Sequence, residues 1–147
     1  MNPLRSVMLV EDNPNDVELT LTALREANLA NEVVVQNDGE QALDYLFRRG
    51  AHAGRPIGQP AVILLDLKMP KVDGHEVLRQ IRGDPELRLI PVVVLTSSRE
   101  EKDLYESYDS GANAYVVKPV DFDEFITAIS KLGVFWALLN EPPPGKA

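Results

Sequence analysis

The residues that could do chemistry stand directly after apolar runs of the chain. Glu11 and Asp12 follow the run VMLV, Asp66 follows AVILL, and Thr96 and Lys118 end two further apolar runs. Adjacent carboxylates repel each other, and a carboxylate that follows the most apolar run should be largely enclosed, where a lone charge is costly. A hard divalent cation among the three carboxylates would remove both costs. The pattern favours a Mg2+ site, because Mg2+ takes oxygen ligands, water and phosphate.

The same residues suit phosphoryl chemistry. Asp66 can act as a carboxylate nucleophile that forms an aspartyl phosphate. The ammonium of Lys118 can pair first with a carboxylate and then with a phosphoryl group, and the hydroxyl of Thr96 can donate to a phosphoryl oxygen. The loop after the first apolar run, EDNPND, lacks the glycines of a P-loop. A nucleotide-driven kinase is therefore not indicated.

Five short apolar runs alternate with helical patterns along the chain. Val17, Leu21 and Leu24 lie on one stripe of a helix expected at residues 14–28, and Asn13 followed by a proline marks its start. Strict alternation, with strands that are apolar throughout, predicts a doubly wound α/β fold whose parallel sheet is covered on both faces. In such sheets ligands bind outside the carboxyl ends of the strands. The expected strands are residues 4–10, 32–36, 61–67, 91–96 and 114–118, and further helix starts are expected at Asp38, Asp73, Ser98 and Asp121.

The composition limits the classes of protein and partner. The chain has 147 residues, of which 44% are hydrophobic, and this suits one domain with one core. Its net charge of -8 disfavours nucleic acid and anionic membranes as partners. Cysteine is absent, so a metal must be bound by oxygen or histidine. Neither a signal sequence nor an apolar run long enough to span a membrane is found, and a cytoplasmic location is expected.

Together these residues resemble the receiver domain of two-component response regulators, the single-domain chemotaxis-regulator fold. The resemblance covers about residues 5–132 and implies a flavodoxin-like, five-stranded parallel sheet in the order 2-1-3-4-5. It also implies a stand-alone regulator that accepts a phosphoryl group on Asp66 from a sensor histidine kinase. Such a protein catalyses only its own phosphotransfer and autodephosphorylation. The matching segments are LVEDN (9–13), LLDLKMPKVDG (64–74), LTS (95–97) and KP (118–119), in the family's order.

The resemblance assigns metal ligands. Asp12, with Glu11 through a water molecule, would bind Mg2+ together with Asp66 and the backbone carbonyl of Lys68. Mn2+ or Ca2+ would be able to substitute for Mg2+.

It also assigns the residues of a switch. Lys118 and Thr96 would contact the phosphoryl oxygens. Tyr115 would turn inward when Thr96 moves, and the alternative for this residue is an aromatic ring that fills a gap beside the fifth strand. The peptide bond between Lys118 and Pro119 would be cis. The face formed by the fourth helix, the fifth strand and the fifth helix would then carry the signal to other proteins.

The segment 48–60, RRGAHAGRPIGQP, lengthens the connection into the third strand. It is expected at the amino ends of the strands, opposite the chemistry. Its arginines allow a basic docking loop, but a solvated spacer is the preferred interpretation. His52 is accordingly no candidate metal ligand.

The C-terminal part is expected to form an extended helix at residues 121–140 and a Pro-rich tail at 141–147, so the receiver domain spans 1–140 and no output domain is expected. Its apolar residues exceed one buried stripe, which favours a two-fold homodimer unless they fold back over their own core. The ending FWALLNEPPP resembles regulators that are paired with phytochrome-type sensor kinases. The interface candidates are Tyr105, Tyr108, Phe135, Trp136, Leu138 and Leu139.

Three other functions fit these residues less well. A Mg2+-dependent phosphatase with Asp66 as nucleophile would commonly need an acid two residues later, where Lys68 stands. A flavodoxin-like cofactor binder would need a phosphate-binding first loop, whereas EDNPND would repel phosphate. A constitutive adaptor would not need the full set of acceptor and metal residues. The downstream target is expected to be another protein.

Overall fold

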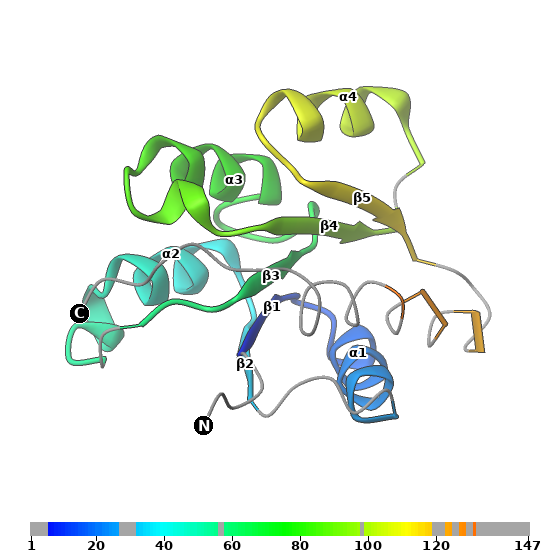
Figure 1. The fold of residues 1–147 in the computed structure, drawn as a ribbon, viewed down its shortest axis with the longest axis horizontal. Helices are drawn as coiled ribbons and strands as arrows, with labels where there is room; N and C mark the ends of the chain where they lie inside the picture. Colours follow the sequence, from blue (N-terminus) through cyan, green and yellow to red (C-terminus); the bar gives the residue numbers. More distant parts are fainter. Residues whose placement is uncertain are drawn as a thin grey trace.

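The computed structural model describes residues 6–26, 32–55, 58–97 and 99–118, together with 123–124, 127–128 and 131. One parallel sheet of five strands has the order β2-β1-β3-β4-β5 (Figure 1), as the sequence predicts. The strands are β1 (Val7–Val10), β2 (Val33–Gln36), β3 (Val62–Leu65), β4 (Val92–Thr96) and β5 (Ala114–Val117). The helices are α1 (Pro14–Glu26), α2 (Gly39–Phe47), α3 (Gly74–Gly83) and α4 (Glu101–Asp109), with short 3-10 turns η1 (Gly50–His52) and η2 (Leu87–Leu89).

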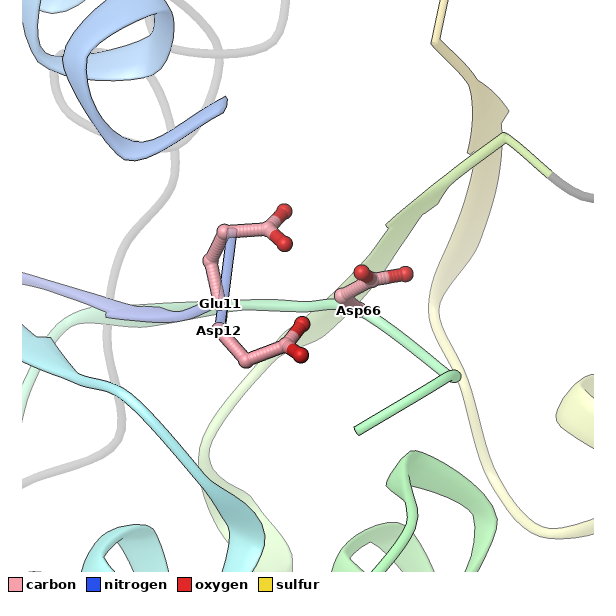
Figure 2. Close-up of side chains that lie close together, drawn as sticks. All are labelled: Glu11, Asp12 and Asp66. Carbon is pink, nitrogen blue, oxygen red and sulfur yellow. The ribbon is translucent and has the colours of Figure 1, made fainter. Parts of the chain in front are cut away.

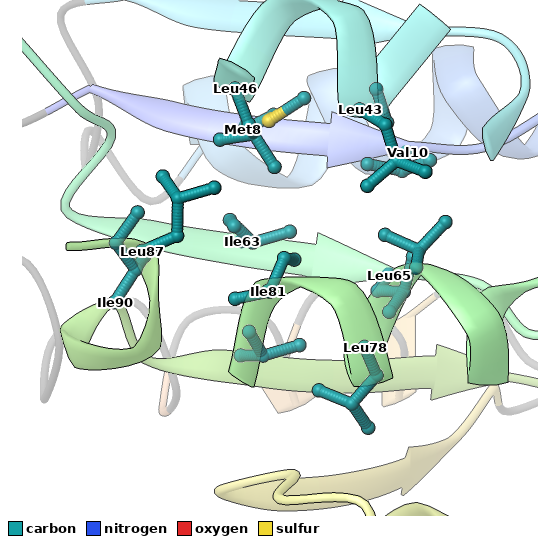
Figure 3. Close-up of a cluster of buried hydrophobic side chains, with 13 residues drawn as sticks. Met8, Val10, Leu43, Leu46, Ile63, Leu65, Leu78, Ile81, Leu87 and Ile90 are labelled. Atoms are coloured by element: carbon teal, nitrogen blue, oxygen red, sulfur yellow. The ribbon is translucent and has the colours of Figure 1, made fainter. Parts of the chain in front are cut away.

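Helices cover both faces of the sheet, and α1 lies on the opposite side from α2 and α3 (Figure 1). Successive residues of a strand point to opposite faces. Met8 and Ile63 therefore pack with Leu43 of α2 and Leu78 of α3 (Figure 3), whereas Leu9 and its neighbours pack with the apolar face of α1. The central strands β1, β3 and β4 are buried throughout. This double coverage explains their unbroken apolar sequences.

Side-chain caps fix the starts of the first three helices. The Asn13 carboxamide oxygen accepts from the backbone N–H groups of Asn15 and Asp16, at 2.9 and 3.2 Å. Asp38 and Asp73 cap α2 and α3 in the same way, at 2.8 and 3.0 Å from the backbone nitrogen three residues later. These three predicted starts are confirmed.

The predicted start of the fourth helix at Ser98 is wrong. Ser98 itself lies outside the described residues, but α4 begins only at Glu101. Glu100 is extended, and its carbonyl accepts the first helical bonds from Asp103 and Leu104, both at 3.1 Å. Ser98 followed three residues later by Glu101 predicts a capping box, but the chain continues for several residues after β4 before α4 begins.

The loop after α2 is more ordered than the solvated spacer that the sequence suggests. The Arg55 guanidinium lies over the Tyr45 ring, 4.1 Å from its centroid, and donates to the Tyr45 carbonyl at 2.9 Å. It also donates to the carbonyl of Gly58 at 2.6 Å. Arg49 pairs with Asp44 at 2.9 Å. The described part of the loop therefore folds back on α2.

Several predictions for the C-terminal part fall on residues that the structure does not describe. These include the Lys118–Pro119 peptide bond, the Asp121 helix start and most of the extended helix. Five described residues between 123 and 131 are helical, and the Thr127 hydroxyl donates to the Asp123 carbonyl at 3.0 Å. In the described parts of the chain, the helices are too short or too polar to cross a membrane. The interface candidates Phe135, Trp136, Leu138 and Leu139 also lie outside the described residues.

Candidate functional site

The parallel register brings the predicted site residues together at the carboxyl edge of the sheet. Val10 is paired with Leu65, so the next residues, Glu11 and Asp66, are neighbours. The backbone N–H of Asp66 donates to the Val10 carbonyl at 3.0 Å, and that of Lys118 donates to the Thr96 carbonyl at 2.7 Å. Adjacent strands that end at the same level thus place side chains from distant parts of the sequence in one site.

Glu11, Asp12 and Asp66 form the acidic cluster that the sequence predicts. One oxygen from each lies within 4.8 Å of the others, and the three carboxylates point into a shared space (Figure 2). Glu11 is only 2% exposed and Asp66 9%, whereas Asp12 is exposed. Burial, together with the smaller effect of the Asp66 charge, raises the pKa of Glu11 to about 7, although the hydrogen bond from Lys118 lowers it. A set of oxygen ligands that repel one another and are partly desolvated fits a hard divalent cation.

Lys118 neutralises part of this charge. Its ammonium contacts Glu11, lies 2.9 Å from Asp16 Oδ2 and lies 3.7 Å from Asp66 Oδ2. Burial disfavours the charged ammonium, but the hydrogen bonds to Glu11 and Asp16 and the charges of Asp66 and Glu11 outweigh this and raise the pKa of Lys118. The side chain is 9% exposed, so these pairs are poorly screened by water.

A backbone hydrogen bond and the packing of α3 fix Asp66. Its Oδ1 accepts from the Leu67 N–H at 2.8 Å, which leaves Oδ2 on the side of Lys118. The first turn of α3 packs directly on this segment, because the Gly74 N–H donates to the Leu67 carbonyl at 2.8 Å. A Cβ atom at Gly74 would lie 2.3 Å from the Asp66 carbonyl oxygen, closer than real Cβ atoms approach. Only glycine fits here without moving the backbone of Asp66.

A cavity of about 370 Å3 adjoins the cluster. Asp12 and Lys68 line it, together with the loop that follows β3 and the first residues of α3 and α4. This position agrees with the predicted use of the Lys68 carbonyl as a metal ligand, which stays a prediction. The lining residues are Asp12, Leu67, Lys68, Met69, Pro70, Asp73, His75 and Asp103.

The two predicted switch residues lie on neighbouring strands. Thr96 ends β4 and is 1% exposed. Tyr115 is half-buried in β5, where it is paired with Val94 of β4. The switch movement stays a prediction.

Sequence reasoning missed two features of the site. The position of Asp16, three residues after Asn13, predicts a capping-box acid at the start of the first helix, but its carboxylate contacts Lys118. The sequence places Asp16 near this edge of the sheet, because the helix directly follows Asp12, but it does not specify the pairing with Lys118. His75 of α3 was not singled out, and its Nε2 lies 3.3 Å from Asp103 Oδ1 of α4, with both side chains largely buried. No local pattern predicts that pair, since 28 positions separate the two residues.

The sequence matches the response regulator receiver domain over residues 7–130. This chain belongs to the response regulator receiver family. Receiver domains are signalling domains that work with histidine kinases and bind Mg2+. The fold, the two-component signalling function and the choice of metal expected from the sequence are thereby confirmed.

Known proteins of this family are similar to this chain over most of its length. Response regulator Rcp1 of Synechocystis sp. is 36% identical over 135 residues, which are 92% of this chain and 90% of the relative. The structure of its Mn2+-bound form has a TM-score of 0.87, with 95% of this chain and 99% of that one covered. The phosphorylated cyanobacterial phytochrome response regulator RcpA has a TM-score of 0.89 at 38% identity, with 96% and 99% covered. The bacteriophytochrome response regulator AtBRR is 64% identical, with a TM-score of 0.77 and 95% and 100% covered.

Proposed function

We propose that this chain accepts a phosphoryl group on Asp66 from a phosphohistidine of a sensor histidine kinase. The observation that carries the proposal is the position of Asp66, a largely buried carboxylate at the sheet edge with Lys118 and two further carboxylates beside it. One oxygen of Asp66 is held by the backbone, and the other faces the cationic side of the site.

In the transfer, Asp66 Oδ2 attacks phosphorus, the P–O bond forms as the P–N bond of the phosphohistidine breaks, and the imidazole leaves and takes up a proton. Lys118 pairs with a phosphoryl oxygen, and the Thr96 hydroxyl donates to another. Glu11, Asp12, Asp66 and the Lys68 carbonyl would hold Mg2+, which when bound neutralises the charges of the carboxylates and the phosphoryl group. The chain catalyses only this transfer and the loss of its own phosphoryl group.

Phosphorylation then changes the contacts that the chain makes with other proteins. Phosphorylation adds charge and acceptor oxygens beside Thr96, and Tyr115 follows the movement of that hydroxyl. The adjacent helix α4 exposes 73% of Tyr105 and 50% of Tyr108, which supports a protein interface there. We place a two-fold homodimer on this face, together with Phe135, Trp136, Leu138 and Leu139. A net charge of -8 makes nucleic acid an unsuitable partner.

The kinase partner is proposed to be of the phytochrome type, in the cytoplasm. The likeness to the bacteriophytochrome response regulator AtBRR, at 64% identity, supports this choice. The test is transfer of radiolabelled phosphate from an autophosphorylated bacteriophytochrome kinase to this chain. Transfer no faster than from an unrelated histidine kinase would contradict the pairing and leave the acceptor chemistry intact.

Intact mass after incubation with acetyl phosphate tests the acceptor chemistry. We expect one phosphoryl adduct that requires Mg2+, that is lost in Asp66→Asn, and that persists in Asp109→Asn, a matched change of an exposed carboxylate on α4. An adduct that survives Asp66→Asn, or none in the wild type, would refute the proposal.

A further inference from the structure

Three carboxylates surround the ammonium of Lys118, and the phosphoryl acceptor is the most distant of them. Glu11 is in direct contact, Asp16 Oδ2 lies at 2.9 Å and Asp66 Oδ2 at 3.7 Å. An ammonium has three hydrogens to donate. Two of them are directed to Glu11 and Asp16, whereas the contact with Asp66, at 3.7 Å, is longer than a hydrogen bond.

Asp16 stands apart from the metal ligands. Among the described residues, the acidic group close enough to share an ion consists of Glu11, Asp12 and Asp66, without Asp16. The backbone of Asp16 is held at the start of α1, since its N–H donates to Asn13 Oδ1 at 3.2 Å and its carbonyl accepts from the Thr20 hydroxyl at 2.8 Å. Its carboxylate is therefore presented to Lys118 by a fixed helix turn.

We propose that Asp16 is a positioning residue that competes with the acceptor Asp66 for the ammonium of Lys118, and so weakens the hold of the site on a phosphoryl group. This inference rests on the proposed function of Asp66. A phosphoryl group on Asp66 adds charge of about -1.5 to -2 and three acceptor oxygens that would compete with Asp16 for the same ammonium. As long as the Lys118 ammonium stays paired with Asp16, its ion pair with the phosphoryl group is weaker. Asp16 thereby limits how long the phosphoryl group is held.

The expected size of the effect follows from the exposure of the pair. The Asp16 side chain is 35% exposed and that of Lys118 is 9% exposed, so water screens the pair only in part. Loss of the Asp16 charge should tighten the binding of a phosphoryl mimic about threefold to tenfold.

Beryllium trifluoride is the phosphoryl mimic for the test, titrated at saturating Mg2+ into the full chain. Asp16→Asn should bind it about threefold to tenfold more tightly than wild type, and Asp16→Glu should restore an affinity within about twofold of wild type. Glu18→Gln is the matched control, because it removes the same charge from the same helix about 200° around its axis and should change nothing. Asp16→Ser removes the same charge and provides a second variant if Asp16→Asn folds poorly.

A second readout separates this role from a structural one. The pKa of the Lys118 ammonium, followed by nitrogen NMR of labelled lysine, should fall in Asp16→Asn because Asp16 helps to raise it. A helix-stabilising role alone would leave that pKa unchanged.

Each outcome has one meaning. If wild type binds beryllium trifluoride and Asp16→Asn binds it no more tightly than Glu18→Gln does, the inference about Asp16 is overturned and the proposed function stands. If wild type does not bind the mimic with Mg2+ present, the proposed function fails and the inference fails with it.

Discussion

Mg2+ affinity should depend on pH through Glu11. Burial raises the pKa of this carboxyl to about 7, from 4.5 for an exposed glutamate. Below pH 7 the carboxyl is mostly protonated and neutral, and the ion must displace that proton. The affinity for Mg2+ should therefore rise with pH up to about 7 and then level off.

The size of the effect follows from the ionised fraction of Glu11. With a pKa of about 7, roughly a tenth of the carboxyl is ionised at pH 6 and about nine tenths at pH 8. The dissociation constant should thus fall about tenfold between these two pH values, which is about 1.4 kcal/mol. The same fractions require that about 0.9 proton is released for each ion bound at pH 6 and about 0.1 at pH 8.

Isothermal titration calorimetry of Mg2+ binding measures both quantities. Titrations in two buffers with different heats of ionisation give the number of protons released. Glu11→Gln cannot ionise, so it should bind Mg2+ weakly and release almost no protons at either pH. An affinity that is equal at pH 6 and pH 8, or proton release that persists in Glu11→Gln, would refute the role of Glu11.

Three further predictions concern the scaffold of the site, each measured by chemical denaturation. Gly74→Ala and Gly39→Ala should each lower the free energy of unfolding by about 1–3 kcal/mol, since the new Cβ atom would lie 2.3 Å or less from a backbone oxygen. Only Gly74→Ala should also weaken Mg2+ binding, because it displaces the backbone of Asp66. Equal Mg2+ affinities of the two variants would contradict this. Arg82→Met should cost about 2–4 kcal/mol, independently of salt, because the guanidinium donates to the carbonyls of Gly111, Arg88 and Ile90 and to Asn113 Oδ1 at 2.8–2.9 Å, with no carboxylate partner among the residues that the structure describes. A strong salt dependence would instead indicate an ion pair. Asp38→Ala should cost about 1–2 kcal/mol through loss of the cap of α2, and a loss below about 0.5 kcal/mol would show that the cap is dispensable.

The fold and the acidic cluster could be predicted because they depend on local patterns. An unbroken apolar run indicates a buried parallel strand, and a carboxylate directly after it, as after β1 and β3, indicates the carboxyl end of that strand. Five strands in alternation with helices leave few topologies. Once the strands are parallel, Glu11 and Asp66 must meet at one edge. Their meeting follows from chain direction and requires no knowledge of side-chain packing.

The contacts between helices and the site could not be predicted from local patterns. Asp16 and Lys118 are 102 positions apart, and their pairing depends on how α1 is rotated against the sheet. His75 and Asp103 meet because α3 and α4 are neighbours, which no capping or periodicity rule specifies. The late start of α4 has the same origin, since the path of the loop after β4 overrode the capping-box pattern at Ser98.

The site of phosphorylation can be located directly by reducing the phosphorylated chain with borohydride, which converts an aspartyl phosphate to homoserine, and mapping the product by peptide mass spectrometry. After incubation with acetyl phosphate and Mg2+, homoserine should be found at Asp66 alone, in the wild type and in Glu18→Gln. Homoserine at Asp12 or Asp16 instead of Asp66, or at no position, would contradict the assignment of Asp66 as the phosphoryl acceptor.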